Sequence, residues 1–196
     1  MPAIGAVILA AGGSTRFGSP KQLLVHEGEP LVARAVCSAR RAGLAPVVVV
    51  VGAEAERITS ALESVQPVSI VTNRSWQSGL ASSLRAGLTW LTVNSACDAA
   101  ILMAADQPLV DAIALGRLKS FFDEFHRVVA SQYDGTIGVP ALIAREYFAE
   151  LMQLDGDAGA GPWLRKRPDV TRVPLTVAAL DIDTPSDAKK LIPVKL

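Results

Sequence analysis

The chain has 196 residues, of which 50% are hydrophobic, and its 19 basic residues balance its 19 acidic ones. This length and composition exclude a disordered chain and predict one globular domain over residues 1–196 with a large core. Zero net charge excludes a broad basic surface for nucleic acid or an anionic membrane, although a local pocket can still bind a small anion.

Cysteine, histidine and hydrophobic patterns exclude further classes of protein. Cys37 and Cys97 have no CxxC spacing, and His26 and His126 stand alone, so we expect neither structural zinc nor a disulfide scaffold. Residues 3–11 are apolar but lack the basic stretch of a signal sequence, and no run of 18 apolar residues exists. We therefore expect a cytoplasmic protein without membrane contact.

The first half of the chain alternates apolar strands with helices. A strand is predicted over residues 3–11 and a helix over 30–42. Five consecutive valines form the next predicted strand, 47–51. Because no polar residue alternates with them, both faces of this strand should be buried, as in a parallel sheet. A helix over 53–65 and a strand over 68–71 follow.

The second half continues this alternation. Leu80, Leu84, Leu88 and Leu91 lie at helical spacing and predict a helix over residues 79–91. The remaining predicted elements are a strand over 99–104, a helix over 111–125, a strand over 128–130, helices over 145–154 and 160–167, strands over 170–173 and 177–182, and a helix over 187–192. The alternation indicates an α/β fold with a mostly parallel sheet.

The loop after the first strand has residues suited to phosphate, and ligands of such sheets bind beyond the carboxyl ends of the strands. Gly12 and Gly13 leave backbone N–H groups open to a ligand, while Arg16 and Lys21 add positive charge. The loop is neither a Walker loop, since two residues separate the GxxxxG spacing from Lys21, nor a GxGxxG motif. The alternative is an ordinary turn with a solvated arginine and lysine.

Later strand ends have hydrogen-bonding and acidic side chains. Asn73 and Ser83 follow the third strand, Asp106 the fourth, and Asp183 the last. Carboxylates would repel a polyphosphate unless a divalent cation lay between them, and Mg²⁺ prefers such oxygen ligands. We therefore expect Asp106 to bind Mg²⁺. The alternatives are a turn or helix N-cap for Asp106 and a helix-start signal for Asp183.

A second glycine-rich loop spans residues 156–161, with the sequence Gly-Asp-Ala-Gly-Ala-Gly. It predicts a lid or wall for a second substrate, because mobile loops often contribute binding residues. A flexible surface loop without a function is the alternative.

Five segments resemble those of MobA-like nucleotidyltransferases. Residues 9–21 resemble the signature LAAGxSxRxGxxK, and the form with two alanines is typical of the molybdenum cofactor cytidylyltransferase (MocA-like) branch. Residues 73–88 resemble N-x-x-W-x-x-G…SSLRAGL, residues 106–108 the DQP motif, residues 156–160 the GDxGA loop, and residues 181–185 the DIDTP motif. The five segments occur in the family's order over most of the chain.

The resemblance implies a three-layer α/β/α, Rossmann-like (GT-A-like) fold and an Mg²⁺-dependent enzyme. The enzyme would transfer a nucleotidyl group from an NTP, with CTP favoured, to a phosphate on molybdopterin and release pyrophosphate. Catalytic residues would be Arg16, Lys21 and Asp106, with Asp106 and Asp183 binding the metal. Nucleotide-binding residues would be Leu9, Ala10, Ala11, Gly12, Gly13, Ser14, Arg16, Lys21, Asn73, Gly79, Ser83 and Asp106. Acceptor-binding residues would be Gln107, Pro108, Val139, Pro140, Asp157 and Gly159.

Three positions depart from the family pattern. Ala105 replaces a common cysteine, Gly138-Val139-Pro140 stands where the cofactor branch often has Gly-His-Pro, and Gly161 stands where an arginine usually follows GDxGA. Val139 and Gly161 fall where the acceptor is expected. These changes leave nucleotide transfer intact and leave the identity of the acceptor open.

Three functions remain open. The first is a molybdopterin cytidylyltransferase, and the second is the same chemistry on a sugar phosphate or alcohol phosphate. The third is a non-catalytic carrier of nucleotide or cofactor, against which the presence of Arg16, Lys21 and Asp106 argues. We expect a monomer, with transient contact to a molybdoenzyme or its chaperone.

Overall fold

The structure is a computed structural model that describes residues 2–191. Its strands are β1 (Ile4–Ala10), β2 (Val25–His26), β3 (Glu29–Pro30), β4 (Val47–Val51), β5 (Ser69–Thr72), β6 (Ala99–Ala104), β7 (Val128–Tyr133), β8 (Thr136–Ala144) and β9 (Thr171–Pro174). Its α-helices are α1 (Leu31–Arg41), α2 (Ala55–Ala61), α3 (Leu80–Asn94), α4 (Ala112–Ser120), α5 (Phe148–Leu151), α6 (Ala160–Lys166) and α7 (Pro185–Lys189).

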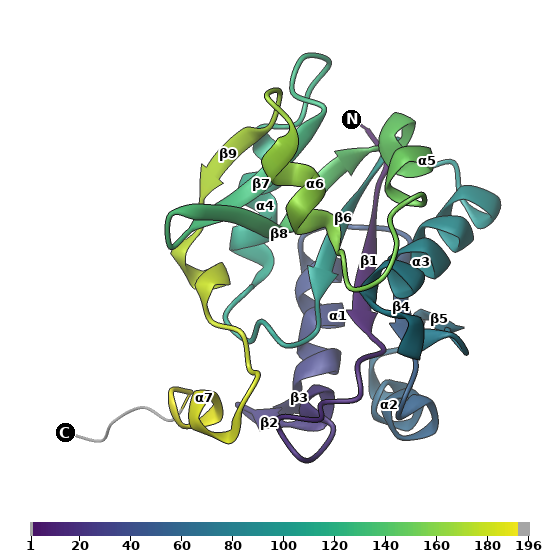
Figure 1. Cartoon of the computed structure of the whole chain (residues 1–196), viewed down its shortest axis with the longest axis vertical. Helices are drawn as coiled ribbons and strands as arrows, with labels where there is room; N and C mark the ends of the chain where they lie inside the picture. Colours follow the sequence, from purple (N-terminus) through teal and green to yellow (C-terminus); the bar gives the residue numbers. More distant parts are fainter. Residues whose placement is uncertain (1, 192–196) are drawn as a thin grey trace.

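Within the described range the main sheet has seven strands in the order β5-β4-β1-β6-β8-β7-β9 (Figure 1). β1 pairs in parallel with both β4 and β6, whereas β8 runs antiparallel to β6 and β7. The predicted mostly parallel sheet is therefore confirmed. Because the chain adds β4 on one side of β1 and β6 on the other, the loops after β1 and β6 meet at a switch point in strand order.

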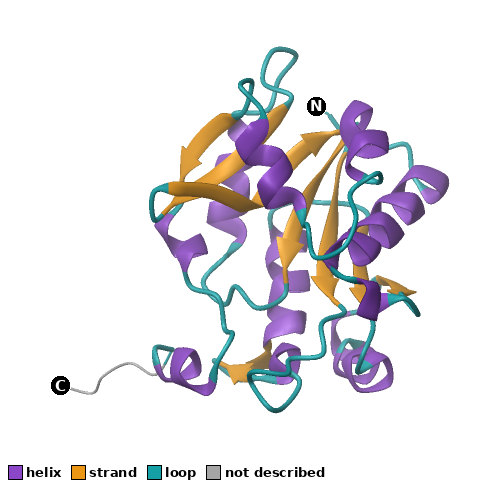
Figure 2. Cartoon of the chain, in the orientation of Figure 1, coloured by secondary structure: helices purple, strands orange, loops and turns teal. Residues whose placement is uncertain are grey.

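Helices cover both faces of this sheet, which gives three layers (Figure 2). Alternate residues of β1 face opposite ways, so Ile8 belongs to one core and Val7 to the other. The first core contains side chains of α1, α2 and α4, and the second contains side chains of α3, α5 and α6. All five valines of β4 are buried between the two cores, as the absence of polar alternation predicts.

Two predictions in the second half of the chain are wrong or incomplete. The segment predicted as a strand over 177–182 contains a 3₁₀ helix, Thr176–Ala179. The residues on either side of this 3₁₀ helix do not pair with a further strand. The Leu175 N–H donates to the Gln132 carbonyl in β7, and the Ile182 N–H donates to the Asp106 carbonyl just after β6. The sequence reading also missed β8.

β8 was not predicted because Pro140 interrupts the pattern of strand-forming residues in this segment. The pairing of β7 with β8 shifts register between Ala130 and Ser131, so that Ala130 pairs with Ala141 and Ser131 with Gly138. The proline therefore lies in a bulge, where its missing N–H breaks no ladder hydrogen bond. The Ser131 hydroxyl donates to the Pro140 carbonyl instead, at 2.6 Å.

Several helix boundaries also differ from the prediction. The segment predicted as one helix over 145–154 consists of a 3₁₀ helix, Arg145–Tyr147, followed by the short α5. α7 begins at Pro185, where Thr184 and Asp187 form a capping box, and the predicted end at 192 lies outside the described residues.

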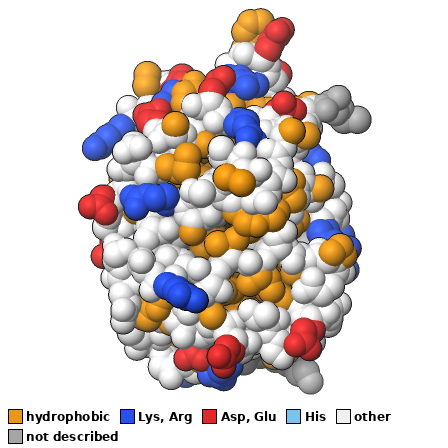
Figure 3. Space-filling view, turned by 90° about the vertical axis from the view of Figure 1, so that its right-hand side faces the viewer, with side chains coloured by type: hydrophobic (Ala, Val, Ile, Leu, Met, Phe, Trp, Pro, Cys, Tyr) orange, Lys and Arg blue, Asp and Glu red, His pale blue; other side chains and the backbone are white. Residues whose placement is uncertain are grey.

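None of the helices in residues 2–191 is long and apolar enough to cross a membrane. On one face of the molecule, hydrophobic side chains gather in a hollow near the middle (Figure 3).

Helix α3 lies so close to the sheet that a methyl group at Gly87 would overlap Val7 and stand 3.0 Å from Val50 Cγ2. We expect Gly87→Ala to lower the free energy of unfolding by about 1–3 kcal/mol through overpacking. Gly116→Ala in α4 is the matched control, because nothing lies within 4 Å of the added carbon apart from its chain neighbours and the backbone of its own helix. It should gain about 0.5–1 kcal/mol of helix propensity. Urea denaturation measures both, and equal stability of the two variants would contradict this packing.

Candidate active site

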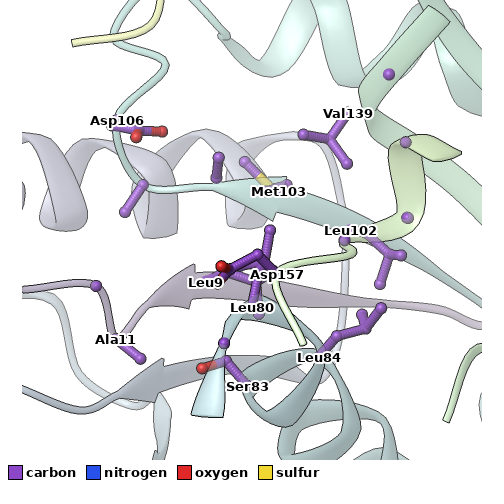
Figure 4. Close-up of a pocket in the computed structure, with 18 of the residues that line it drawn as sticks. Leu9, Ala11, Leu80, Ser83, Leu84, Leu102, Met103, Asp106, Val139 and Asp157 are labelled. Atoms are coloured by element: carbon purple, nitrogen blue, oxygen red, sulfur yellow. The ribbon is translucent and has the colours of Figure 1, made fainter. Parts of the chain in front are cut away.

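A cavity of about 580 Å³ opens where the carboxyl ends of β1 and β6 meet the start of α3. This volume suits a nucleotide-sized ligand. Its walls come from the loop after β1, the end of β6, the β7–β8 hairpin, the 157–159 loop and α6. In the view of Figure 4, Asp106 and Val139 lie on opposite sides of Met103.

Most of the predicted nucleotide-binding residues line this cavity. The predicted site residues in its lining are Leu9, Ala11, Gly12, Gly13, Lys21, Gly79, Ser83, Asp106, Val139, Asp157 and Gly159. The other predicted residues lie behind or beside the lining, namely Ala10, Ser14, Arg16, Asn73, Gln107, Pro108, Pro140 and Asp183. Of these, the exposed Arg16 and Asp183 lie beside the cavity edge, whereas Asn73 and Gln107 are buried.

A buried glutamine holds the glycine-rich loop in shape. Gln22 Nε2 donates to the carbonyl oxygens of Ala10 and Gly12, at 3.2 and 2.9 Å. The Ser14 hydroxyl donates to Gln22 Oε1 at 3.2 Å and accepts the N–H of Lys21 at 3.1 Å. Ser14 and Ala10 therefore shape the loop. Sequence reasoning missed Gln22, and a polar residue directly after Lys21 was the available signal.

Lys21 lies between two carboxylates that come from distant parts of the chain. Its Nζ is 2.6 Å from Asp106 Oδ2 and 2.6 Å from Asp183 Oδ1. Burial lowers the pKa of Lys21, but the charges and hydrogen bonds of both carboxylates outweigh it, so the pKa is raised above 10.5. Arg16 also pairs with Asp183, at 3.3 Å, but its side chain is 77% exposed. The cavity edge thus holds a charged lysine at neutral pH.

The carboxylates at this edge favour a further cation. The pKa of the Asp181 carboxyl, which reaches the surface, is raised to about 6, first by restricted hydration and then by the charge of Asp106. Within residues 2–191 no group of three His, Cys, Asp or Glu side chains forms a closed metal site. Asp106 and Asp183 both contact the Lys21 ammonium through one oxygen, and their carboxylates could supply oxygen ligands to a Mg²⁺ ion that completes its shell with phosphate and water.

Asn73 acts through its neighbours at the start of α3. It is buried, and its Nδ2 donates to the hydroxyls of Ser82 and Ser83, at 2.8 and 3.0 Å. Its Oδ1 accepts the N–H of Ser75 at 2.9 Å. Asn73 therefore orients Ser83, whose side chain faces the cavity. Trp76 packs over Gly13, with ring atoms 3.2 Å from the position of a Cβ there.

The far wall of the cavity is mostly apolar. Leu80, Leu84, Leu102, Ile137 and Val139 contribute to it. Gln107 is buried behind this wall, where its Nε2 donates to the carbonyls of Val139 and Ala178, at 3.1 and 2.8 Å. Gln107 therefore ties β8 to the 3₁₀ helix at 176–179.

Comparisons with known proteins agree with this geometry. Residues 6–171 match the sequence model of the MobA-like NTP transferase domain. The chain is 33% identical over 187 residues to nicotine blue oxidoreductase of Paenarthrobacter nicotinovorans, covering 86% of this chain and 84% of that protein. It resembles the structure of Rv0371c from Mycobacterium tuberculosis H37Rv, with a TM-score of 0.83, 28% identity and 97% of each chain covered. A complex of Rv0371c with manganese gives a TM-score of 0.81 at 27% identity, covering 98% of this chain and 99% of that one.

The contact between Gly79 and the 156–157 backbone can be tested directly. Gly79 has a φ of 106°, and an added Cβ would overlap the Gly156 carbonyl and stand 2.8 Å from Asp157 N. We expect Gly79→Ala to displace this loop and to lower the free energy of unfolding by about 1–3 kcal/mol. The Ala81 amide, which donates to Gly156 at 3.1 Å, should then exchange hydrogen faster.

Gly12→Ala is the matched control for Gly79→Ala, because nothing lies within 4 Å of its added carbon. It should leave both stability and Ala81 exchange unchanged. Unchanged Ala81 exchange in Gly79→Ala would show that the loop does not rest on Gly79.

Proposed function

Because the chain belongs to the MobA-like NTP transferase family, we propose that it transfers CMP from CTP to the phosphate of molybdopterin. An oxygen of the acceptor phosphate attacks the α-phosphorus of CTP and forms a new P–O bond. The bond from the α-phosphorus to the bridging oxygen of the β-phosphate breaks, and pyrophosphate leaves with that electron pair. The observation that supports this chemistry most directly is Lys21 held between Asp106 and Asp183 beside the glycine-rich loop.

The residues at this edge match what phosphoryl-type transfer requires, which is positioning and charge stabilisation. Backbone N–H groups of Gly12 and Gly13 are open to the phosphates, and Lys21 offsets the charge that develops on the leaving group. Asp106 and Asp183 would hold Mg²⁺, which would neutralise phosphate charge when bound. Arg16, exposed and next to Asp183, can reach the outer phosphates.

The metal, the nucleotide and the acceptor are each supported by a different observation. A divalent cation is supported by the manganese complex of the similar Rv0371c. CTP is supported by the two alanines of the loop, Ala10 and Ala11, which are typical of the cytidylyltransferase branch. Molybdopterin is supported by the same resemblance and by the apolar wall, which suits a flat heterocycle. We further propose that the enzyme is a monomeric, single-domain cytoplasmic protein.

A second candidate function is oxidoreduction, which the 33% identity to nicotine blue oxidoreductase favours. Oxidoreduction has no need for a lysine between two carboxylates, so the charged edge favours nucleotidyl transfer. Pyrophosphate release is the deciding measurement, made with each NTP and with molybdopterin, a sugar phosphate or no acceptor. Release with molybdopterin and CTP supports the proposal, and release only with the sugar phosphate overturns the acceptor. Oxidation or reduction of nicotine blue without any pyrophosphate release would favour the oxidoreductase.

Lys21→Ala should reduce kcat/KM for pyrophosphate release by about 10²–10³-fold, as the loss of an oxyanion-stabilising donor does. The exposed Lys189, which does not line the cavity, provides the control Lys189→Ala, with unchanged kinetics. A loss of less than about tenfold in Lys21→Ala, which is about 1.4 kcal/mol, would remove Lys21 from the mechanism.

Asp106→Ala should abolish Mg²⁺-dependent turnover while the fold survives, because the metal loses a carboxylate ligand at the cavity edge. Circular dichroism checks the fold, and turnover is followed across a titration of Mg²⁺ and Mn²⁺. Glu56→Ala, an exposed change in α2, is the control for loss of one negative charge. Persistent activity with an unaltered Mg²⁺ requirement would show that Asp106 is not a metal ligand.

A further inference from the structure

A second cationic side chain, Arg165, lines the cavity and lies far along the chain from Lys21. Within the described residues, Lys21 and Arg165 are the lysine and arginine side chains in its lining. Lys21 is paired with two carboxylates, as described above. Arg167, two residues after Arg165, is likewise paired with Glu150 and Asp169, at 3.1 and 2.7 Å. Arg165 has no such acidic partner in residues 2–191.

The backbone of α6 leaves space for the Arg165 guanidinium. Gly161 lies one helical turn before Arg165, and a Cβ at Gly161 would stand only 3.0 Å from Arg165 Nη1 and 3.8 Å from Cζ. The guanidinium therefore folds back over the glycine, against the wall to which both residues contribute. A larger side chain at position 161 would push the guanidinium away from this place.

The β7–β8 hairpin forms the part of the cavity wall next to α6, which packs against β8. Tyr133, Thr136, Ile137 and Val139 line the cavity there, and the Tyr133 hydroxyl donates to the Val139 carbonyl at 3.2 Å. Burial raises the pKa of Tyr133, and the positive charge of Arg165 acts in the opposite direction, so the guanidinium lies within electrostatic range of this hydroxyl. An unneutralised guanidinium beside an apolar wall suits a ligand with a flat apolar body and an anionic group.

We propose that Arg165 binds an anionic group of the second substrate, and that Gly161 provides the space for it to do so. The proposal rests on the proposed transferase function and deepens it, because it assigns a residue for acceptor binding that differs from the nucleotide-binding residues. The planar guanidinium can donate two parallel hydrogen bonds to a phosphate, which a lysine cannot do. Arg165 is thus a specificity residue at the acceptor end of the cavity.

The test compares wild type with Arg165→Ala, Arg165→Lys and the control Lys166→Ala, whose side chain is exposed and outside the lining. Binding of CTP and of molybdopterin is measured separately by calorimetry, and the KM of molybdopterin is measured by pyrophosphate release. We expect Arg165→Ala to weaken molybdopterin binding and raise its KM by about tenfold or more, with CTP affinity changed less than about twofold. Arg165→Lys should restore only part of the loss, and Lys166→Ala should behave as wild type.

A double-mutant cycle tests the role of Gly161. Gly161→Leu should weaken molybdopterin binding in the presence of Arg165, and it should add little loss in the Arg165→Ala background. Dephosphorylated molybdopterin should bind wild type and Arg165→Ala equally if the phosphate is the group recognised. A difference that persists with this probe would overturn the phosphate as the recognised group.

The binding measurement separates this inference from the transferase reaction. If wild type binds molybdopterin but releases no pyrophosphate, the proposed function fails while the Arg165 comparison still decides the inference. Equal molybdopterin affinity of wild type and Arg165→Ala, an equal loss of CTP affinity, or no molybdopterin binding by wild type would each overturn the assignment of Arg165.

Discussion

The ion pairs of Lys21 with Asp106 and Asp183 hold the charged edge of the site together. They join the loop after β1, the end of β6 and the segment before α7, which are far apart in the chain. Burial of the Lys21 side chain lowers its pKa, and the two carboxylates outweigh this effect, so that the pKa is raised and the lysine is charged. The same carboxylates are the oxygen ligands that a magnesium ion would need, so structure and chemistry depend on one cluster.

The position of β1 in the sheet is what brings this cluster together. β1 has β4 on one side and β6 on the other, and Leu9 is aligned with Ala104 in the β1–β6 register. The two strands therefore end at the same height, and the loops that follow them face one another. Gln22 then holds the first loop open by bonding to its carbonyls, which leaves the loop N–H groups of Gly12 and Gly13 for a ligand.

The cavity wall near the start of α3 depends on close backbone approach. Gly79 meets the backbone at 156–157, and Gly159 packs against the Leu80 side chain, so the second glycine-rich loop lies against the start of α3. Gly161 has a different role, since it makes room for the Arg165 side chain. Some glycines in this region are needed because a side chain would overlap a neighbour, and others because the backbone has a positive φ. A sequence pattern cannot tell these two reasons apart.

Much of this protein follows from its sequence alone. Apolar runs such as residues 47–51 predict buried parallel strands, because their side chains must avoid water on both faces. The motif residues Lys21, Asp106 and Gly79 point to a nucleotide site at the strand ends, and all three line the cavity.

Other features were decided only by the tertiary structure. Asn73 and Gln107 look like ligand-binding residues in sequence, but hydrogen bonds within the protein hold their side chains in supporting positions. β8 could not be predicted, because Pro140 is tolerated there only by a bulge in the pairing with β7. Arg165 carries no motif, and its place in the cavity results from the fold of α6 over the sheet. Local patterns determine which residues prefer burial, strands or turns, whereas long-range packing decides which polar groups meet one another and which remain open to a ligand.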